Sequence, residues 1–170
     1  PDVELGRRLH GLEGLSDKQV GYVMQTRQRE QTGSEFLSLE QQRVVAISVA
    51  MRTRDGFTAW SLGAPGWTEA EVVGQFFDAI ERHSPTLVSW NGSGFDLPVL
   101  HYRAMRHRVQ AHRYWETGDE EQSFRWNNYL GRFHWRHIDL MDVLAGYQGR
   151  GRVGLDRMAL LLGLPGKLGM

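Results

Sequence analysis

The sequence predicts an α/β or α+β protein in which a mixed sheet is flanked by helices. Three observations carry this expectation: an apolar, β-branched run over residues 43–51, apolar stripes at helical spacing, and the order of helical and strand segments along the chain. A length of 170 residues with 41% apolar and 24% charged side chains is typical of a globular domain. We therefore expect residues 1–170 to belong to a single domain.

Composition excludes several classes of protein. The chain has no cysteine, which excludes disulfide scaffolds, zinc ribbons and cysteine nucleophiles. No apolar run approaches the ~20 residues that a membrane span requires. Twenty basic and twenty acidic residues cancel, which excludes a bulk polycation but allows a local basic face. Together these features predict a cytoplasmic protein that does not act at membranes.

Two helices are predicted at the start of the chain. Leu5, Leu9 and Leu12 share one helical face. A second helix should begin at Ser16, where Gln19 completes a capping box, and should run to about residue 30.

A hairpin should follow these helices. Residues 43–51 are apolar on both faces, which predicts a central strand. Asp55-Gly56 is typical of a hairpin turn, so residues 57–62 should form the partner strand.

The second half predicts helices that alternate with short strands. Thr68 should cap a helix, with Glu71 in the capping-box position and an apolar stripe from Val72 to Ile80. The remaining expected elements are a buried strand over residues 86–90, a helix from Asp96 with Pro98 in its first turn, an irregular aromatic segment over residues 112–132, a strand over residues 137–140, and a helix over residues 155–162 closed by Gly163.

The segment from Leu87 to Leu100 carries the chemical signal. A short strand ends in the glycine-rich turn Asn91-Gly92-Ser93-Gly94, and Asp96 follows at a helix start. Ligand sites in α/β proteins favour the carboxyl ends of strands, and carboxylate oxygens suit Mg²⁺ or Mn²⁺. Asp is also a common N-cap residue, so Asp96 could cap the helix, bind a cation, or do both.

This segment resembles the second motif of the DEDD 3′–5′ exonucleases, Asn-x-x-x-Phe-Asp. Residues 89–100 (SWNGSGFDLPVL) look most like the predicted bacterial exonucleases related to the proofreading domain of family B DNA polymerases. Residues 137–144 (HIDLMDVL) look like that family's next strand and helix. Residues 155–167 look like the helix before its third motif, and Pro1-Asp2 looks like the residues after its first motif.

The resemblance implies a ribonuclease-H-like mixed sheet flanked by helices and removal of nucleotides from a single-stranded 3′ end, with DNA favoured over RNA. It implies two Mg²⁺ or Mn²⁺ ions held by four acidic residues, and it assigns one ligand and catalytic position to Asp96. Asn91 would then hydrogen-bond the terminal nucleotide, and Phe95 would pack against it.

Two motifs of that family are not found within residues 1–170. Asp2-Val3-Glu4 imitates the first motif, Asp-x-Glu, but no apolar strand precedes it and it begins a helical stretch. The third motif, Tyr-x-x-x-Asp, does not appear. We therefore expect a partial domain that lacks the first strand and last helix and has little or no nuclease activity by itself. Asp139 could face the cleft, but a hydrogen-bonded or capping role is favoured for it and for Asp142.

Basic residues concentrate after the motif. Residues 97–170 carry eleven basic and seven acidic side chains, and eighteen of the twenty basic residues in the chain are arginine. Arg103 and Arg106 follow Asp96 on the predicted helix, and we expect them to contact phosphates. Further arginines alternate with aromatic residues over residues 124–136, a pattern that suits single-stranded nucleic acid or an aromatic loop folded onto the core.

Other chemistries find less support. His134 and His137 lack the further ligands of a zinc site. The glycine-rich turn matches neither a nucleophile elbow nor a phosphate-binding P-loop. The alternative to an exonuclease is a catalytically silent module on the same fold that binds nucleic acid or a protein partner.

Overall fold

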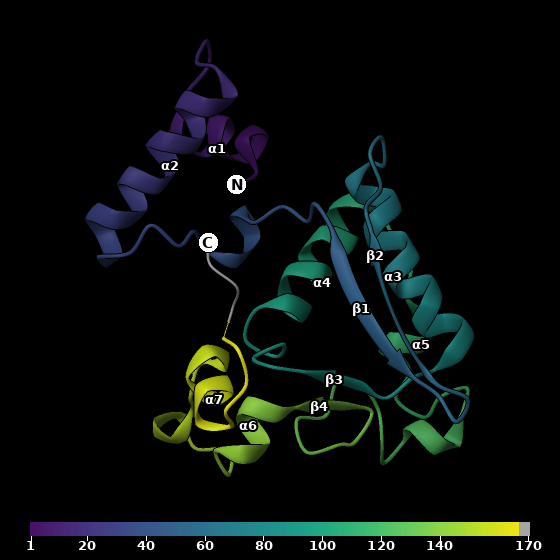
Figure 1. Cartoon of the computed structure of the whole chain (residues 1–170). Coiled ribbons are helices and arrows are strands. Elements are labelled where there is room, and N and C mark those ends of the chain that lie inside the picture. The colour runs from purple at the N-terminus through teal and green to yellow at the C-terminus, as the bar shows by residue number, and fades with distance from the viewer. Residues whose placement is uncertain (167–170) are drawn as a thin grey trace. The chain divides into compact units, whose positions relative to one another are not determined.

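The computed structural model describes residues 1–166 and shows a mixed α/β protein with small sheets (Figure 1). Its α-helices are α1 (Val3–His10), α2 (Asp17–Thr32), α3 (Glu69–His83), α4 (Asp96–His107), α5 (His112–Trp115), α6 (Leu140–Leu144) and α7 (Leu155–Leu161). Its strands are β1 (Ile47–Arg52), β2 (Phe57–Leu62), β3 (Leu87–Ser89) and β4 (His137–Asp139). Single 3₁₀ turns occur at Leu39–Gln41, Gln122–Phe124 and Gly149–Gly151.

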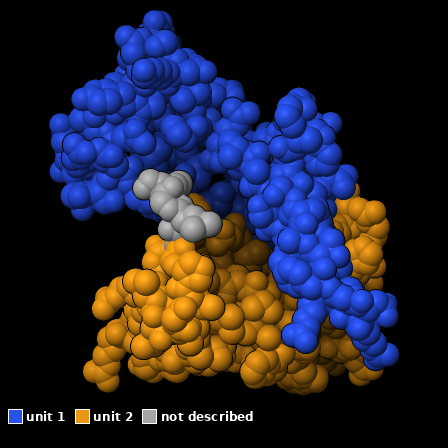
Figure 2. All heavy atoms as spheres, viewed as in Figure 1, with its two compact units in different colours: residues 1–76, 98–110 blue, residues 77–97, 111–170 orange. Residues whose placement is uncertain are grey.

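The chain divides into two compact units (Figure 2). The first unit comprises residues 1–76 and 98–110, and the second comprises residues 77–97 and 111–170. The candidate loop between β3 and α4 belongs to the second unit, together with β4 and α6.

The predicted helix starts are confirmed. The Ser16 hydroxyl accepts the Gln19 N–H, and the Gln19 side chain accepts the Ser16 N–H, so α2 begins with a complete capping box. Thr68 and Glu71 exchange the same pair of bonds before α3. Local hydrogen bonds of this kind need only residues three apart, which explains why the sequence predicts them correctly.

The expected single mixed sheet is not found among the described residues, which form two separate sheets. β1 and β2 form an antiparallel hairpin in which Ile47 pairs with Leu62 and Arg52 pairs with Phe57. β3 and β4 form a parallel pair in which Leu87 lies opposite His137.

The strand expected over residues 43–51 is shorter than predicted and is not central. It begins at Ile47, because Val45 lies in an irregular segment and is 77% exposed. Every second residue of β1 is exposed, and within residues 1–166 no strand other than β2 pairs with it. β3 is likewise not fully buried, since Val88 is 60% exposed. An apolar strand is buried only when further strands or helices cover it, and a run of residues does not show whether they do.

Each unit has its own apolar core. In the first unit, Val20, Met24 and Leu37 form a buried cluster against which Val3, Leu12 and Leu15 pack. In the second unit, the rings of Tyr114 and Tyr129 stack at a centroid distance of 5.3 Å, and Phe77 meets Tyr114 edge-on. Within residues 1–166 no helix is long and apolar enough to cross a membrane.

Candidate functional site

The site is built on the turn that joins β3 to α4. The Asn91 carbonyl accepts hydrogen bonds from the N–H groups of Gly94 and Phe95, both at 3.0 Å. Asn91 has φ of 63°, in the left-handed region, which Asn tolerates better than most residues. The Leu97 N–H then donates to the Gly92 carbonyl at 2.9 Å, and this hydrogen bond joins the turn to the first turn of α4.

Two glycines allow the turn to close. A Cβ atom at Gly92 would lie 2.3 Å from the Ser89 Oγ and 2.5 Å from the Ser89 Cβ. A Cβ atom at Gly94 would lie 2.5 Å from the Asn91 Oδ1. The turn therefore requires glycine at both positions for space.

Asp139 fixes this turn from the neighbouring strand. Its Oδ1 accepts the Asn91 N–H at 2.8 Å, and its Oδ2 accepts the Ser93 N–H at 3.0 Å. The same carboxylate caps α6 by accepting the Met141 N–H at 3.2 Å. Asp139 is 6% exposed, so the structural role favoured for it by the sequence is confirmed.

A serine–histidine pair lies beneath the turn. The Ser89 Oγ, at the end of β3, is 2.8 Å from the Nε2 of His137, the first residue of β4. Burial lowers the pKa of His137, against the opposing effect of the Asp139 and Asp142 carboxylates, so the imidazole is neutral at neutral pH. The two residues are 48 positions apart, and no local pattern in the sequence indicates that they pair.

Asp96 is the first residue of α4, and its side chain is exposed at the end of the turn. Partial loss of hydration raises the pKa of its carboxyl, the Asp96 backbone N–H lowers it, and the charge of nearby Asp139 raises it further. A carboxyl whose pKa is raised beside a second negative charge gains from a bound cation, which would offset that repulsion.

The described residues do not form a complete metal site. Within residues 1–166, no three His, Asp or Glu side chains are grouped closely enough to hold a metal ion. Asp139 uses both carboxylate oxygens on backbone N–H groups, which leaves Asp96 as the exposed carboxylate at the turn. This donor set fits one ligand position and does not fit a complete two-ion centre.

Arg103 occupies a different environment from the one expected. It lies about two turns beyond Asp96 on α4, is 3% exposed, and donates to Glu69 at 2.7 Å and to Asp2 at 2.6 Å. A phosphate contact would require these buried ion pairs to break, which costs free energy. The nucleic-acid role expected of Arg103 therefore stays a prediction. Arg106 is more exposed and pairs with Glu4 at 2.6 Å.

Asp2 also has a structural role. Its Oδ1 accepts the Leu5 N–H at 3.0 Å and so caps α1, and its side chain is buried against Arg103. The sequence Asp2-Val3-Glu4 therefore starts a helix, as expected, and does not reproduce the strand of an Asp-x-Glu motif.

The aromatic segment over residues 124–136 divides into two sets. Phe124 and Tyr129 are buried in the core of the second unit, with the Arg136 guanidinium 3.6 Å from the centroid of the Phe124 ring. The side chains of Trp126, Phe133 and Trp135 are exposed. The interpretation of an aromatic segment folded onto the core is thus confirmed for Phe124 and Tyr129, and nucleic-acid contact by the exposed rings stays a prediction.

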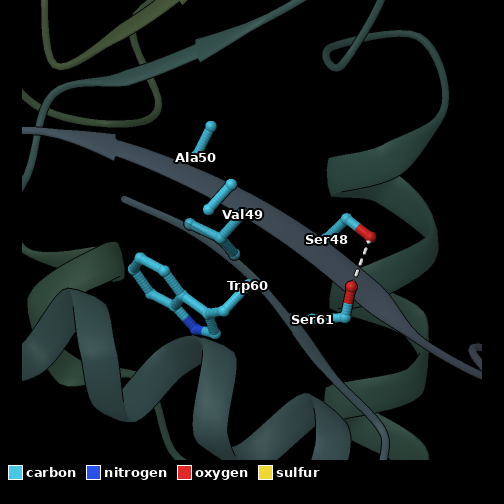
Figure 3. Close-up of a pocket in the computed structure, with 6 residues that line it drawn as sticks. Ser48, Val49, Ala50, Trp60 and Ser61 are labelled. Atoms are coloured by element: carbon cyan, nitrogen blue, oxygen red, sulfur yellow. Dashed lines mark hydrogen bonds between the residues drawn. The ribbon is translucent and has the colours of Figure 1, made fainter. Parts of the chain in front are cut away.

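A surface hollow on the β1–β2 hairpin contains none of the predicted site residues (Figure 3). Ser48 and Ser61 face each other across the two strands with their hydroxyl oxygens 2.9 Å apart, and Trp60 lies alongside. No titratable side chain lines this hollow, so it offers no acid–base or metal chemistry.

The second unit thus places an exposed carboxylate after a short strand and a glycine-rich turn, and the buried carboxylate of Asp139 fixes that turn. In α/β proteins, ligand sites favour this position at the carboxyl end of a strand. Residues 34–170 match the family described as a predicted 3′–5′ exonuclease related to the exonuclease domain of PolB. The chain belongs to this family, which confirms the resemblance, and the match covers the turn and Asp96. Its last residues, including Lys167, lie outside the described part of the chain. No curated protein and no solved structure matches the chain.

Proposed function

We propose that this protein is a metal-dependent 3′–5′ exonuclease that acts on single-stranded ends, DNA in preference to RNA, on a ribonuclease-H-like fold. The observation that carries the proposal is the exposed carboxylate of Asp96 on a turn that Asp139 fixes through two backbone N–H groups. Membership of the exonuclease family supports the reaction, and the geometry of the turn supports the position.

Each residue of the turn has a proposed role. Asp96 holds a Mg²⁺ or Mn²⁺ ion, Asn91 hydrogen-bonds the terminal nucleotide, and Phe95 packs against it. When bound, divalent ions would polarise the scissile phosphate and make water a better nucleophile. Arg106, three turns along α4, neutralises a phosphate farther from the end.

We propose further that residues 1–170 do not turn over substrate by themselves. One exposed carboxylate at the turn cannot gather two divalent ions, and within the described residues no three His, Asp or Glu side chains are grouped closely enough to hold one. Metal-dependent degradation of an oligonucleotide by this purified chain would contradict this proposal.

The same observation favours a second candidate function, a catalytically silent module that binds nucleic acid or a protein partner. On that account Asp96 would serve only as the first residue of α4.

The test uses the protein as its gene encodes it, with a 5′-fluorescein single-stranded 20-mer of DNA or RNA and Mg²⁺ or Mn²⁺. We expect progressive shortening from the 3′ end that is faster on DNA, is stopped by chelation, and is lost in Asp96→Asn. Asp78→Asn is the matched control, because Asp78 is an exposed aspartate on α3. Binding without shortening would favour the silent module, and unchanged turnover in Asp96→Asn would exclude the proposed role of Asp96.

A further inference from the structure

A second group of side chains in the same unit has no part in the proposed chemistry. Arg132 and Arg152 both bind the carboxylate of Asp142, which is 2% exposed; the Tyr147 ring lies beside Arg132, and the Phe133 ring packs against Tyr147. The Phe133 and Tyr147 rings meet edge-on at 4.7 Å, and the Arg132 guanidinium lies 5.5 Å from the Tyr147 ring. We call these five residues the arginine–aromatic cluster.

The cluster has more positive charge than its own structure needs. One buried carboxylate requires one cation for neutrality. The Asp142 carboxylate has two, the guanidiniums of Arg132 and Arg152, which leaves an excess of one positive charge. The side chain of Arg132 is 48% exposed and that of Arg152 is 38% exposed. A guanidinium has five N–H donors, and the contacts of the cluster use two from Arg132 and one from Arg152. Both guanidiniums can therefore donate further hydrogen bonds to an anion from solvent.

The aromatic part of the cluster is exposed and held in place. Phe133 is 67% exposed, and the Tyr147 ring is packed against it edge-on. Tyr147 has φ of 61°, a left-handed conformation that is uncommon for a bulky residue and costs on the order of 1 kcal/mol. Its N–H donates to the Asp142 carbonyl at 2.8 Å, and its carbonyl accepts from Arg132. Local strain maintained by such contacts is typical of binding sites.

The arginine–aromatic cluster is connected to the candidate turn at two points. Asp142 lies in α6, whose N-cap Asp139 fixes the turn. The Trp90 indole, one residue before Asn91, donates to the Val153 carbonyl at 3.0 Å, next to Arg152. All of these residues belong to the second unit, so the cluster lies beside the turn within one compact body.

We propose that the arginine–aromatic cluster binds single-stranded nucleic acid, with Arg132 and Arg152 on a backbone phosphate and Phe133 stacked on a base. Arginine forms bidentate contacts with phosphate, and an exposed ring accepts any base face. The inference rests on the proposed function, because the cluster would bind the part of the nucleic-acid strand that leads to the 3′ end held at Asn91 and Asp96.

The test measures oligonucleotide binding by fluorescence anisotropy with the 170-residue chain in EDTA, so that no cleavage contributes. The probes are 5′-fluorescein dT12 and rU12, titrated over a range of KCl concentrations. We expect Arg152→Gln to weaken binding and to reduce the slope of log K against log salt by about 0.7, the value for one phosphate contact on a single strand. Arg152→Lys should retain the slope, because it keeps the positive charge. Comparison of dT12 with rU12 shows whether the chain prefers deoxyribose or ribose.

The aromatic contact has its own variant. Phe133→Ala should weaken binding by at least about fivefold with little change in the salt slope, because base stacking is mainly not ionic. Phe57→Ala is the matched control, since Phe57 is 69% exposed in the other unit. Arg54→Gln, on the exposed hairpin turn, is the control for charge. Urea midpoints confirm that each variant folds.

The outcomes separate this inference from the proposed function. If the wild type binds the probes, and Arg152→Gln and Phe133→Ala bind them as tightly as their control variants do, the cluster proposal is overturned. The exonuclease proposal is then unaffected. No binding of either probe by the wild type overturns both the cluster and the proposed substrate class.

Discussion

Replacing Asp139 with alanine should release the turn that presents Asp96. The carboxylate accepts the N–H groups of Asn91, Ser93 and Met141 at 2.8, 3.0 and 3.2 Å. Loss of the α6 cap costs about 1 kcal/mol. Each of the two loop N–H groups that loses its charged acceptor adds about 1 kcal/mol to the destabilisation. This is the low end of the usual range of about 1–3 kcal/mol, because the loop is half-exposed and water replaces part of each bond. We therefore expect Asp139→Ala to lower the free energy of unfolding by about 3 kcal/mol.

The assay is urea unfolding followed by tryptophan fluorescence, with amide hydrogen exchange as a local readout. Asp139→Asn keeps one acceptor oxygen and loses one of the three hydrogen bonds, so it should lower the free energy of unfolding by about a third as much, about 1 kcal/mol. Asp78→Ala, an exposed aspartate on α3, should change the free energy by less than about 0.5 kcal/mol. A value for Asp139→Ala within that same margin, or unchanged exchange at Asn91 and Ser93, would refute the role assigned to this carboxylate.

Three further substitutions test other parts of the structure by urea unfolding. Arg103→Met should lower the free energy of unfolding by about 3 kcal/mol or more, since it removes the buried cation that two buried carboxylates share, and a near-zero change would show that these ion pairs do not stabilise the fold. Gly92→Ala should cost about 1–3 kcal/mol because its Cβ would overlap Ser89, whereas Gly74→Ala, in α3 with no atom nearby, should not destabilise; equal effects would contradict the packing of the turn. Burial alone would raise the pKa of Asp142, but its guanidinium partners outweigh burial and hold the pKa below its usual value. The stability from ionised Asp142 is thus present above about pH 4 and is lost as pH falls through the lowered pKa, so Asp142→Asn should flatten the loss of stability in acid, and an unchanged acid profile would contradict this.

Local signals in the sequence predict the helices well. The capping boxes of α2 and α3 and the Asp96 start of α4 depend on residues within one turn of each other. The β1–β2 hairpin follows from its Asp-Gly turn and is likewise local.

Long-range contacts determine the features that the sequence does not predict. The arginines of α4 have the composition of a phosphate-binding face, yet Arg103 is buried because Asp2, 101 residues earlier, and Glu69, 34 residues earlier, provide carboxylates. Asp139 holds Asn91 across 48 residues in the same way. Nothing near either position in the sequence identifies its partner.

Binding of Mn²⁺ to the ¹⁵N-labelled chain tests most directly whether the Asp96 carboxylate is a cation ligand. Paramagnetic broadening reports weak binding residue by residue, so one carboxylate suffices for a signal. We predict that amides of residues 91–97 broaden at low Mn²⁺ and that Asp96→Asn removes this effect without altering broadening at other acidic residues. Sharp signals throughout residues 91–97, or broadening there that persists in Asp96→Asn, would contradict the assignment.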